Sequence, residues 1–189
     1  MKPELMYTNP IISVCLGILF LLHPSVHAEK ADASKPVSID ADSSVYDDIK
    51  QTTISTGNVI VTRGTLLMKA GKMILKTDPA GYQFATLLPG PSGFTSFRQK
   101  RDGGDLWVDG RAERIEYDNK TDVVKLYSKA NLKRLEGTKT TDEMEGEFIS
   151  YDSRTDLFTV NNTADGNSKP GSGRIKVIIQ PRSETPGKP

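Results

Sequence analysis

The amino-acid sequence predicts an all-β protein built from a repeated hairpin. The segment IEYDNKTDVVKL, residues 115–126, recurs 34 residues later as ISYDSRTDLFTV, residues 149–160. In both copies, alternating apolar residues run into an Asp-containing turn and then resume, which is the pattern of strand, turn and strand. Asp118 and Asp152 suit such turns because a short carboxylate accepts hydrogen bonds from the backbone amides ahead of it. No convincing helical pattern follows residue 28, so the remaining chain is predicted to form strands and turns.

The repeat extends beyond these two copies. In both copies a small residue stands five positions before the tyrosine, and we call this spacing the frame. Two earlier segments share the frame, and the small residues of all four are Ala41, Ala70, Ala112 and Gly146. This series predicts four stacked units whose apolar faces cover one another. The widest gap, between the second and third units, places an insertion at residues 78–105.

The N-terminal segment has the pattern of a secretory signal peptide. An apolar run at residues 11–22 is preceded by Lys2 and followed by Val-His-Ala at residues 26–28, which predicts cleavage after Ala28. The run is too short for a membrane span, which needs roughly 20 apolar residues. Because Glu4 offsets the charge of Lys2, an uncleaved anchor is the alternative.

Removal of residues 1–28 would take away the single cysteine, Cys15, and both histidines, His23 and His27. A lipid-modified Cys15 is disfavoured because Val14 stands where a small residue is needed. The mature chain would then have no Cys nucleophile, His general base, disulfide or zinc site built from those ligands. With 25 basic and 24 acidic side chains, the net charge of +1 gives no support to a nucleic-acid partner.

After a polar, flexible leader at residues 29–36, strands are predicted from residue 37. Residues 53–76 form the most apolar part of the mature chain, with glycines every seven residues at Gly57, Gly64 and Gly71. A helical heptad is disfavoured because glycine costs about 1 kcal/mol inside a helix and residues 59–62 are a β-branched run. Strands are therefore predicted here, with apolar residues on both faces.

The insertion at residues 78–105 contains three prolines and several large apolar residues. The prolines argue against regular structure over its centre, and the segment is interpreted as a loop folded over one end of the core. The alternative is a mobile flap over a ligand groove. Residues 100–105 are predicted to form a hairpin turn.

The C-terminal third continues the pattern. The basic residues between positions 123 and 136 are interpreted as a solvated face, with a binding patch as the alternative. A polar, glycine-rich loop is predicted at residues 161–173, a last strand at residues 174–180, and a disordered tail at residues 181–189. One β domain is thus expected over residues 37–180.

The paired acids Asp118/Asp122 and Asp152/Asp156 are candidate glycosidase carboxylates or calcium ligands. A turn-forming role is favoured, because an active site is built once whereas these acids recur with the fold. No P-loop, nucleophile elbow or dinucleotide fingerprint occurs. The sequence therefore predicts no catalytic residue, no cofactor and no metal site.

Three stretches carry a family resemblance: residues 56–75 (TGNVIVTRGTLLMKAGKMIL), residues 108–112 (VDGRA) leading to Tyr117, and Gly146 leading to Tyr151. On these, residues 37–180 resemble the OstA-like family of periplasmic lipopolysaccharide-transport proteins. The resemblance implies an open, slightly twisted antiparallel β-jelly roll whose interior holds the acyl chains of lipid A. It also implies end-to-end stacking of copies, which link an inner-membrane anchored component of similar fold to the N-terminal domain of an outer-membrane translocon.

Two sets of residues follow from this reading. The predicted lipid-binding row is Val59, Val61, Leu66, Met68, Met73, Leu75, Val108, Ile115, Tyr117, Val124, Leu126, Leu132 and Ile149. The predicted oligomer and partner edges are Val37, Ile39 and Ala41 at one end and Ile175, Val177 and Ile179 at the other.

Alternation alone does not separate residues that touch lipid from residues that fill a solid core. A structural periplasmic adaptor would use the same strands around a filled interior. A glycan-binding or glycan-degrading β domain would need exposed aromatics on one face or a single carboxylate pair, and the sequence offers Trp107 and scattered tyrosines.

Overall fold

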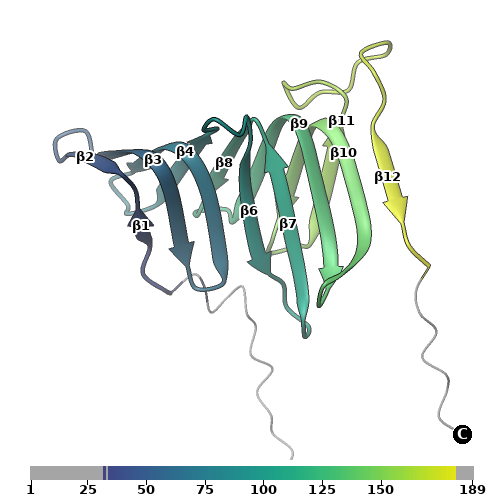
Figure 1. Cartoon of the computed structure of the whole chain (residues 1–189), viewed down its shortest axis with the longest axis horizontal. Helices are drawn as coiled ribbons and strands as arrows, with labels where there is room; N and C mark the ends of the chain where they lie inside the picture. Colours follow the sequence, from purple (N-terminus) through teal and green to yellow (C-terminus); the bar gives the residue numbers. More distant parts are fainter. Residues whose placement is uncertain (1–31, 33, 182–189) are drawn as a thin grey trace, which may run out of the picture.

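The computed structural model describes residue 32 and residues 34–181 of the chain. The predicted signal peptide and nearly all of the predicted tail lie outside these residues. Twelve strands in the described part pair into one antiparallel sheet (Figure 1). In chain order they are β1 (Ser38–Asp40), β2 (Ser43–Asp47), β3 (Thr52–Arg63), β4 (Leu66–Thr77), β5 (Gln83–Leu88), β6 (Thr95–Lys100), β7 (Leu106–Ala112), β8 (Arg114–Asp118), β9 (Val123–Glu136), β10 (Lys139–Asp152), β11 (Leu157–Asn161) and β12 (Lys176–Ile179). The predicted all-β class is confirmed.

The sheet is folded into two layers because four long strands run through both. Layer A contains β2, β5, β8 and β11, and layer B contains β1, β6, β7 and β12 (Figure 1). In β3, for example, residues 52–56 pair with β2 in layer A and residues 60–62 pair with β1 in layer B. Strands β4, β9 and β10 divide in the same way between the layers. Each layer buries one face against the other, and the core lies between them.

The chain crosses between the layers at small or left-handed residues. In β3 the crossing lies at Gly57 and Asn58, which have φ of 78° and 45° and interrupt the register with β4. At Gly71 the backbones approach so closely that a Cβ would lie 2.3 Å from the Cα of Gly90. A second register shift in the β9–β10 ladder falls just after Gly146. Glycines thus mark the layer crossings, where a bulky side chain would not fit, and one of them, Gly146, belongs to the repeated frame.

The four repeated units are confirmed as hairpins. They are β2–β3, β4–β5, β8–β9 and β10–β11, each paired across its own turn. The predicted turn chemistry is also confirmed. The Asp118 carboxylate accepts hydrogen bonds from the backbone amides of Lys120 (2.8 Å) and Thr121 (3.3 Å). Asp152 does the same for Arg154 and Thr155.

The interpretation of residues 78–105 as a covering loop is wrong. Strand β5 belongs to layer A and β6 to layer B, and they contribute Leu87 and Phe97 to the core at 0% and 2% exposure. The prolines misled the interpretation because they lie between strands: Pro79 follows β4, and Pro89 and Pro91 connect β5 to β6. Only the connection lacks regular structure, and the predicted hairpin turn between β6 and β7 is present at residues 101–105.

The last strand is shorter than predicted, spanning Lys176–Ile179, and it follows the predicted polar loop. It pairs antiparallel with β10. Near the other end of the chain, Asp32 accepts a 2.9 Å hydrogen bond from the backbone amide of Thr65 in the β3–β4 turn. This contact fixes one described residue of the predicted leader.

Candidate functional site

The predicted inward row lies in one continuous apolar interior between the layers. All thirteen residues belong to the core cluster or pack against it. Except for Leu75 and Tyr117, which are half-buried, none is more than 3% exposed. The parity within β3 and β4 is also as predicted, since Val61 and Met68 are buried whereas Lys69 is exposed. Contact of this row with lipid stays a prediction.

Further residues share the interior that the sequence reasoning left out of the row. They are Ala85, Leu87, Phe97, Ala112, Ala130, Met144 and Tyr151. Leu87 and Phe97 were missed because their segment was interpreted as a loop. Ala85 and Leu87, like Thr95 and Phe97, are two positions apart and lie on the same face of their strand. This period of two is the signal that would have identified both strands.

The interior is closely packed in this structure. A cavity lined by Val37, Arg63, Met73 and Tyr117, among others, has a volume of about 20 Å³. That is room for a single water-sized group, and an acyl chain needs many times this volume. The row therefore forms a filled core in this structure.

Both ends of the sheet are unpaired edges in the described part of the chain. Strands β1 and β2 each pair only with β3, and β11 and β12 each pair only with β10. At the first end Val37, Ile39 and Ala41 are partly buried against the core. At the second, Ile175, Val177 and Ile179 are 43%, 47% and 74% exposed. The predicted edge residues thus lie at opposite ends of the molecule.

The register of β12 shows which of its amides face outward. The Gln180 amide donates to the Thr141 carbonyl, so these two opposite residues form a hydrogen-bonded pair. Such pairs alternate along an antiparallel ladder, and Val177, opposite Met144, therefore falls in a non-bonded pair. Its N–H and C=O groups point away from β10, toward the open edge.

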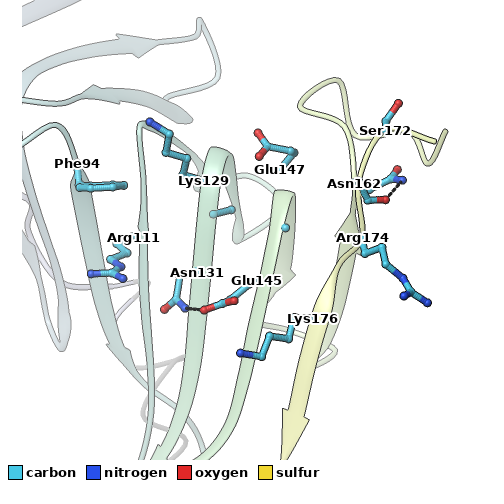
Figure 2. A pocket seen from close by; sticks show the side chains of 13 residues that line it. Phe94, Arg111, Lys129, Asn131, Glu145, Glu147, Asn162, Ser172, Arg174 and Lys176 are labelled. Atoms are coloured by element: carbon cyan, nitrogen blue, oxygen red, sulfur yellow. Dashed lines mark hydrogen bonds between the residues drawn. The ribbon is translucent and has the colours of Figure 1, made fainter. Parts of the chain in front are cut away.

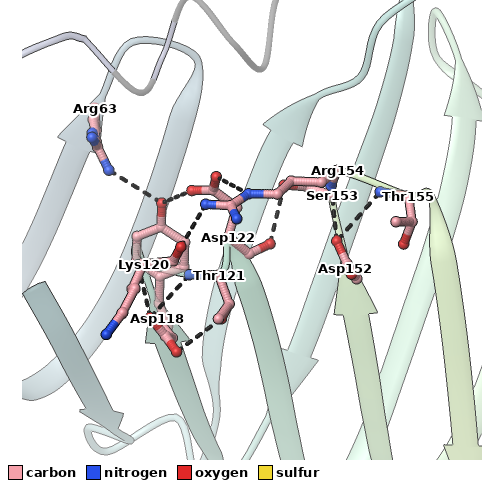
Figure 3. Close-up of polar contacts among 10 residues, drawn as sticks. Arg63, Asp118, Lys120, Thr121, Asp122, Asp152, Ser153, Arg154 and Thr155 are labelled. Atoms are coloured by element: carbon pink, nitrogen blue, oxygen red, sulfur yellow. Dashed lines mark hydrogen bonds and ion pairs between the residues drawn. The ribbon is translucent and has the colours of Figure 1, made fainter. Parts of the chain in front are cut away.

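Polar contacts join the two layers on the side where their turns meet. We call this side the mouth; it contains residues 63–65 and 101–105 of layer B and residues 117–122 and 151–156 of layer A. At the first contact, Arg63 Nη1 donates to Tyr117 Oη at 3.3 Å, and Tyr117 Oη donates to Asp122 Oδ1 at 3.4 Å (Figure 3). Arg154 Nε donates to the other oxygen of Asp122 at 2.8 Å.

The second contact repeats the first. Arg101 Nε donates to Asp156 Oδ1 at 2.9 Å, Arg101 Nη2 pairs with Asp156 Oδ2, and Tyr151 Oη donates to Asp156 at 3.4 Å. In both contacts a tyrosine donates to the aspartate five residues later, and an arginine of the opposite layer binds this pair, through the tyrosine in the first contact and through the aspartate in the second. Sequence reasoning favoured a turn-forming role for Asp122 and Asp156. It missed the contacts of Arg63 with Tyr117 and of Arg101 with Asp156, because these residues are distant in the sequence.

Electrostatics keep these groups in their bonding forms. Burial and the neighbouring Asp122 carboxylate raise the pKa of Tyr117 to about 12, so its hydroxyl remains a donor at neutral pH. Burial disfavours the charge on Arg101, but the hydrogen bonds and charge of Asp156 outweigh this effect, and the pKa of Arg101 is raised. Asp122 and Asp156 adopt left-handed backbone, with φ of 52° and 58°, a conformation that aspartate tolerates better than most residues.

A hollow of about 360 Å³ lies elsewhere, on the outer face of layer B beside the loop before β12 (Figure 2). It is lined by basic groups such as Arg111 and Lys176 and by Glu145, which accepts a 3.4 Å hydrogen bond from Asn131. Asn131 and Glu145 alternate with the inward Leu132 and Met144, so they line the hollow from the face of β9 and β10 opposite to the predicted row.

Three of the four basic residues of β9 are paired with acids. Lys129 Nζ lies 2.6 Å from Glu113, Lys133 Nζ 3.2 Å from Glu143, and Arg134 Nη1 3.2 Å from Asp142. In residues 32 and 34–181, no group of three or more His, Cys, Asp or Glu side chains is placed to hold a metal ion. No helix in the same residues has the length and apolar character to cross a membrane.

These features define a class of protein: an open antiparallel β-jelly roll with an apolar interior and an unpaired edge at each end. The family model described as LptA/(LptD N-terminal domain) LPS transport protein matches residues 38–157. The chain belongs to this family, which confirms the resemblance inferred from the sequence.

Individual relatives agree. The lipopolysaccharide export system protein LptA of Haemophilus influenzae is 29% identical over 167 residues, covering 88% of this chain and 89% of the relative. LptA of Escherichia coli K12 is 31% identical over 124 residues, covering 66% of this chain and 63% of the relative.

A solved structure has the same fold. LptH of Pseudomonas aeruginosa, described as the LptA homologous periplasmic component of a lipopolysaccharide transport device, superposes with a TM-score of 0.69 at 24% identity. The match covers 80% of this chain and 99% of that one. The expected jelly roll is therefore confirmed.

Proposed function

We propose that this protein carries lipopolysaccharide across the periplasm, with the acyl chains of lipid A shielded between its two layers. The observation that carries the proposal is the unbroken apolar interior of a chain that belongs to a lipopolysaccharide-transport family. An acyl chain of about a dozen carbons costs on the order of 10 kcal/mol to expose to water, at roughly 0.8 kcal/mol per CH₂. A continuous apolar path removes this penalty at each step of transfer.

The same proposal includes a bridge between the membranes. Each layer ends in an edge strand at both ends of the molecule, β2 and β11 in layer A and β1 and β12 in layer B. Unpaired edges are templates for strand addition. Copies stacked head to tail would continue both layers and the interior between them. The same edges would bind an inner-membrane anchored component of similar fold and the N-terminal domain of an outer-membrane translocon.

Export and the absence of catalysis belong to the proposal as well. The protein is delivered to the periplasm by cleavage after Ala28, and it acts as a carrier without catalysing a reaction. The N-terminal sequence of the protein purified from its host tests the first statement. A start distant from Glu29, or retention in the membrane fraction after a salt wash, would contradict it.

Site-specific photo-crosslinking tests the interior as the lipid path. A photoreactive residue at Val61 or Met68 is expected to label lipopolysaccharide in cells, because these positions face the interior. The matched positions Thr62 and Lys69, one residue further along the same strands, are expected to remain unlabelled, because a one-residue step reverses the side chain. Equal labelling at both parities would refute the assignment.

The close packing of the interior favours a second candidate, a structural adaptor that joins its partners without carrying lipid. Such an adaptor needs the edges and a filled core, and both are present. Mass spectrometry of the protein purified from its native host separates the two functions. Co-purified lipid A supports transport, and protein that is reproducibly free of lipid supports the adaptor.

A further inference from the structure

Lipid cannot enter the interior unless the two layers separate. The inward row is nearly inaccessible to solvent, and the cavity beside Met73 holds about 20 Å³. At the crossings the layers are joined by continuous backbone in β3, β4, β9 and β10. Separation must therefore occur on the opposite side, at the mouth, where side-chain contacts join the layers.

The mouth is joined by the two arginine contacts described above. Arg63 donates to the Tyr117 hydroxyl, which in turn donates to Asp122, and Arg101 forms a two-point contact with Asp156. Paired guanidinium and carboxylate groups of this geometry are among the stronger polar contacts in proteins. The Arg101 side chain is 8% exposed and that of Asp156 is 48% exposed, so the contact is sheltered on one side and open to an incoming group on the other.

These contacts also stand at the boundary between apolar and polar surroundings. Arg63 and Tyr117 line the same interior cavity as Met68 and Met73, and the buried Tyr151 carries the bond to Asp156. An amphiphile with its acyl chains in the interior would place its head group against this rim. Phosphate accepts paired hydrogen bonds from guanidinium in the same way as carboxylate, and it carries more negative charge.

We propose that the two arginine contacts form a latch that holds the layers closed, and that the phosphates of an entering polyacylated lipid open it by taking Arg63 from Tyr117 and Arg101 from Asp156. This inference rests on the proposed transport function and adds the groups that recognise the lipid head. The acyl chains then occupy the space between the separated layers. When the lipid leaves, Arg63 returns to Tyr117 and Arg101 to Asp156, and the interior closes.

Three double variants, one of them a control, separate the parts of the latch. Asp122→Asn/Asp156→Asn removes two carboxylate charges, that of the direct partner of Arg101 and that of the acceptor of the Tyr117 hydroxyl. Asparagine tolerates the left-handed backbone at both positions. The matched control is Asp118→Asn/Asp152→Asn, which removes the same charge from the same turns without touching Arg63 or Arg101. A third variant, Arg63→Gln/Arg101→Gln, opens the latch and also removes the cations.

Opening is measured without lipid, by the distance between spin labels at Thr138→Cys and Thr155→Cys, on exposed turns of the two layers. The only natural cysteine is Cys15, so a chain produced without residues 1–28 carries these two labels alone. The aspartate and arginine variants are expected to show a longer and broader distance distribution than the parent. The control is expected to match the parent.

Lipid uptake is measured with hexaacylated diphosphoryl lipid A and with the same lipid stripped of its phosphates. The parent is expected to take up the phosphorylated lipid faster than the lipid without phosphates. The aspartate variant is expected to be about tenfold faster than the parent, which corresponds to the loss of about one charged hydrogen bond in total. The arginine variant is expected to lose the preference for phosphate.

The outcomes separate the latch from transport. If the aspartate variant keeps the distances and uptake rate of the parent and the control, while the parent takes up lipid, the latch is refuted and the transport function stands. If neither the parent nor any variant takes up lipid, the proposed function fails and the latch fails with it.

Discussion

The contact between Phe97 and Gly110 gives the sharpest test of the interior packing. The two residues are opposite each other in β6 and β7, and Phe97 is 2% exposed. A Cβ on Gly110 would lie 2.1 Å from Cε1 of Phe97 and 2.9 Å from Cδ2 of Leu126. Gly110→Ala therefore overpacks the core, and we expect it to lower the free energy of unfolding by about 1–3 kcal/mol. Phe97→Ala leaves a cavity and is expected to cost about 3–5 kcal/mol.

The double variant distinguishes this reasoning from a general sensitivity of the core. In Phe97→Ala/Gly110→Ala the new methyl group occupies part of the vacated space, so the two costs should not add. We expect the loss in unfolding free energy to fall short of the sum by about 0.5–3 kcal/mol, the usual range for residues in contact. Equilibrium urea unfolding followed by circular dichroism measures all four proteins. Simple additivity would show that the Phe97 ring does not occupy the space above Gly110.

Three other predictions follow from the edge, the mouth and a layer crossing. Val177→Pro removes an amide that points to the open edge, so the protein is expected to stay folded but to lose head-to-tail association in sedimentation. Val177→Thr keeps the amide and should assemble. Assembly of the proline variant would exclude β12 as the joint. The Tyr117 pKa of about 12 lies above the ordinary tyrosine value of about 10. The stability that its protonated form contributes is therefore fully present below pH 10 and is lost as pH rises through 12. Tyr117→Phe should reduce this alkaline fall in melting temperature, and an unchanged pH dependence would contradict the assignment. Gly71→Ala would place a Cβ 2.3 Å from the Cα of Gly90, so we expect it to lower the free energy of unfolding, measured in urea, by about 1–3 kcal/mol. An unchanged free energy of unfolding would show that the crossing is loosely packed.

Local features of the sequence predicted the hairpins well. The turn aspartates and the period-two alternation around them act within a dozen residues, so they can be interpreted without knowing the fold. The prediction failed at β5 and β6 because prolines between two short strands were taken as evidence against the strands themselves. Pro89 and Pro91 cause no loss of ladder hydrogen bonds, since they occupy the connection where the chain passes from one layer to the other.

The mouth could not be predicted, for a different physical reason. Arg63 and Arg101 lie 54 and 55 residues from their partners Tyr117 and Asp156. Only the layer arrangement brings these strand ends together. The sequence did contain half of the signal, because Asp122 and Asp156 occupy equivalent positions in the two copies of the repeat. An acid that recurs at a left-handed turn position, where glycine would be easier to accommodate, indicates a role for its carboxylate beyond the turn.

The long strands that pass through both layers limit how the molecule can move. Two separate sheets could slide over each other, but β3, β4, β9 and β10 each carry one backbone from layer A into layer B. These shared backbones prevent the two layers from sliding over each other. The motion they allow is a rotation of one layer against the other about the line of crossings. Strand pairing ties each long strand to its neighbours, so one unit cannot rotate far without straining the next. In a stack of copies, this coupling would make a separation of the layers at one end favour their separation in the next copy along the common axis.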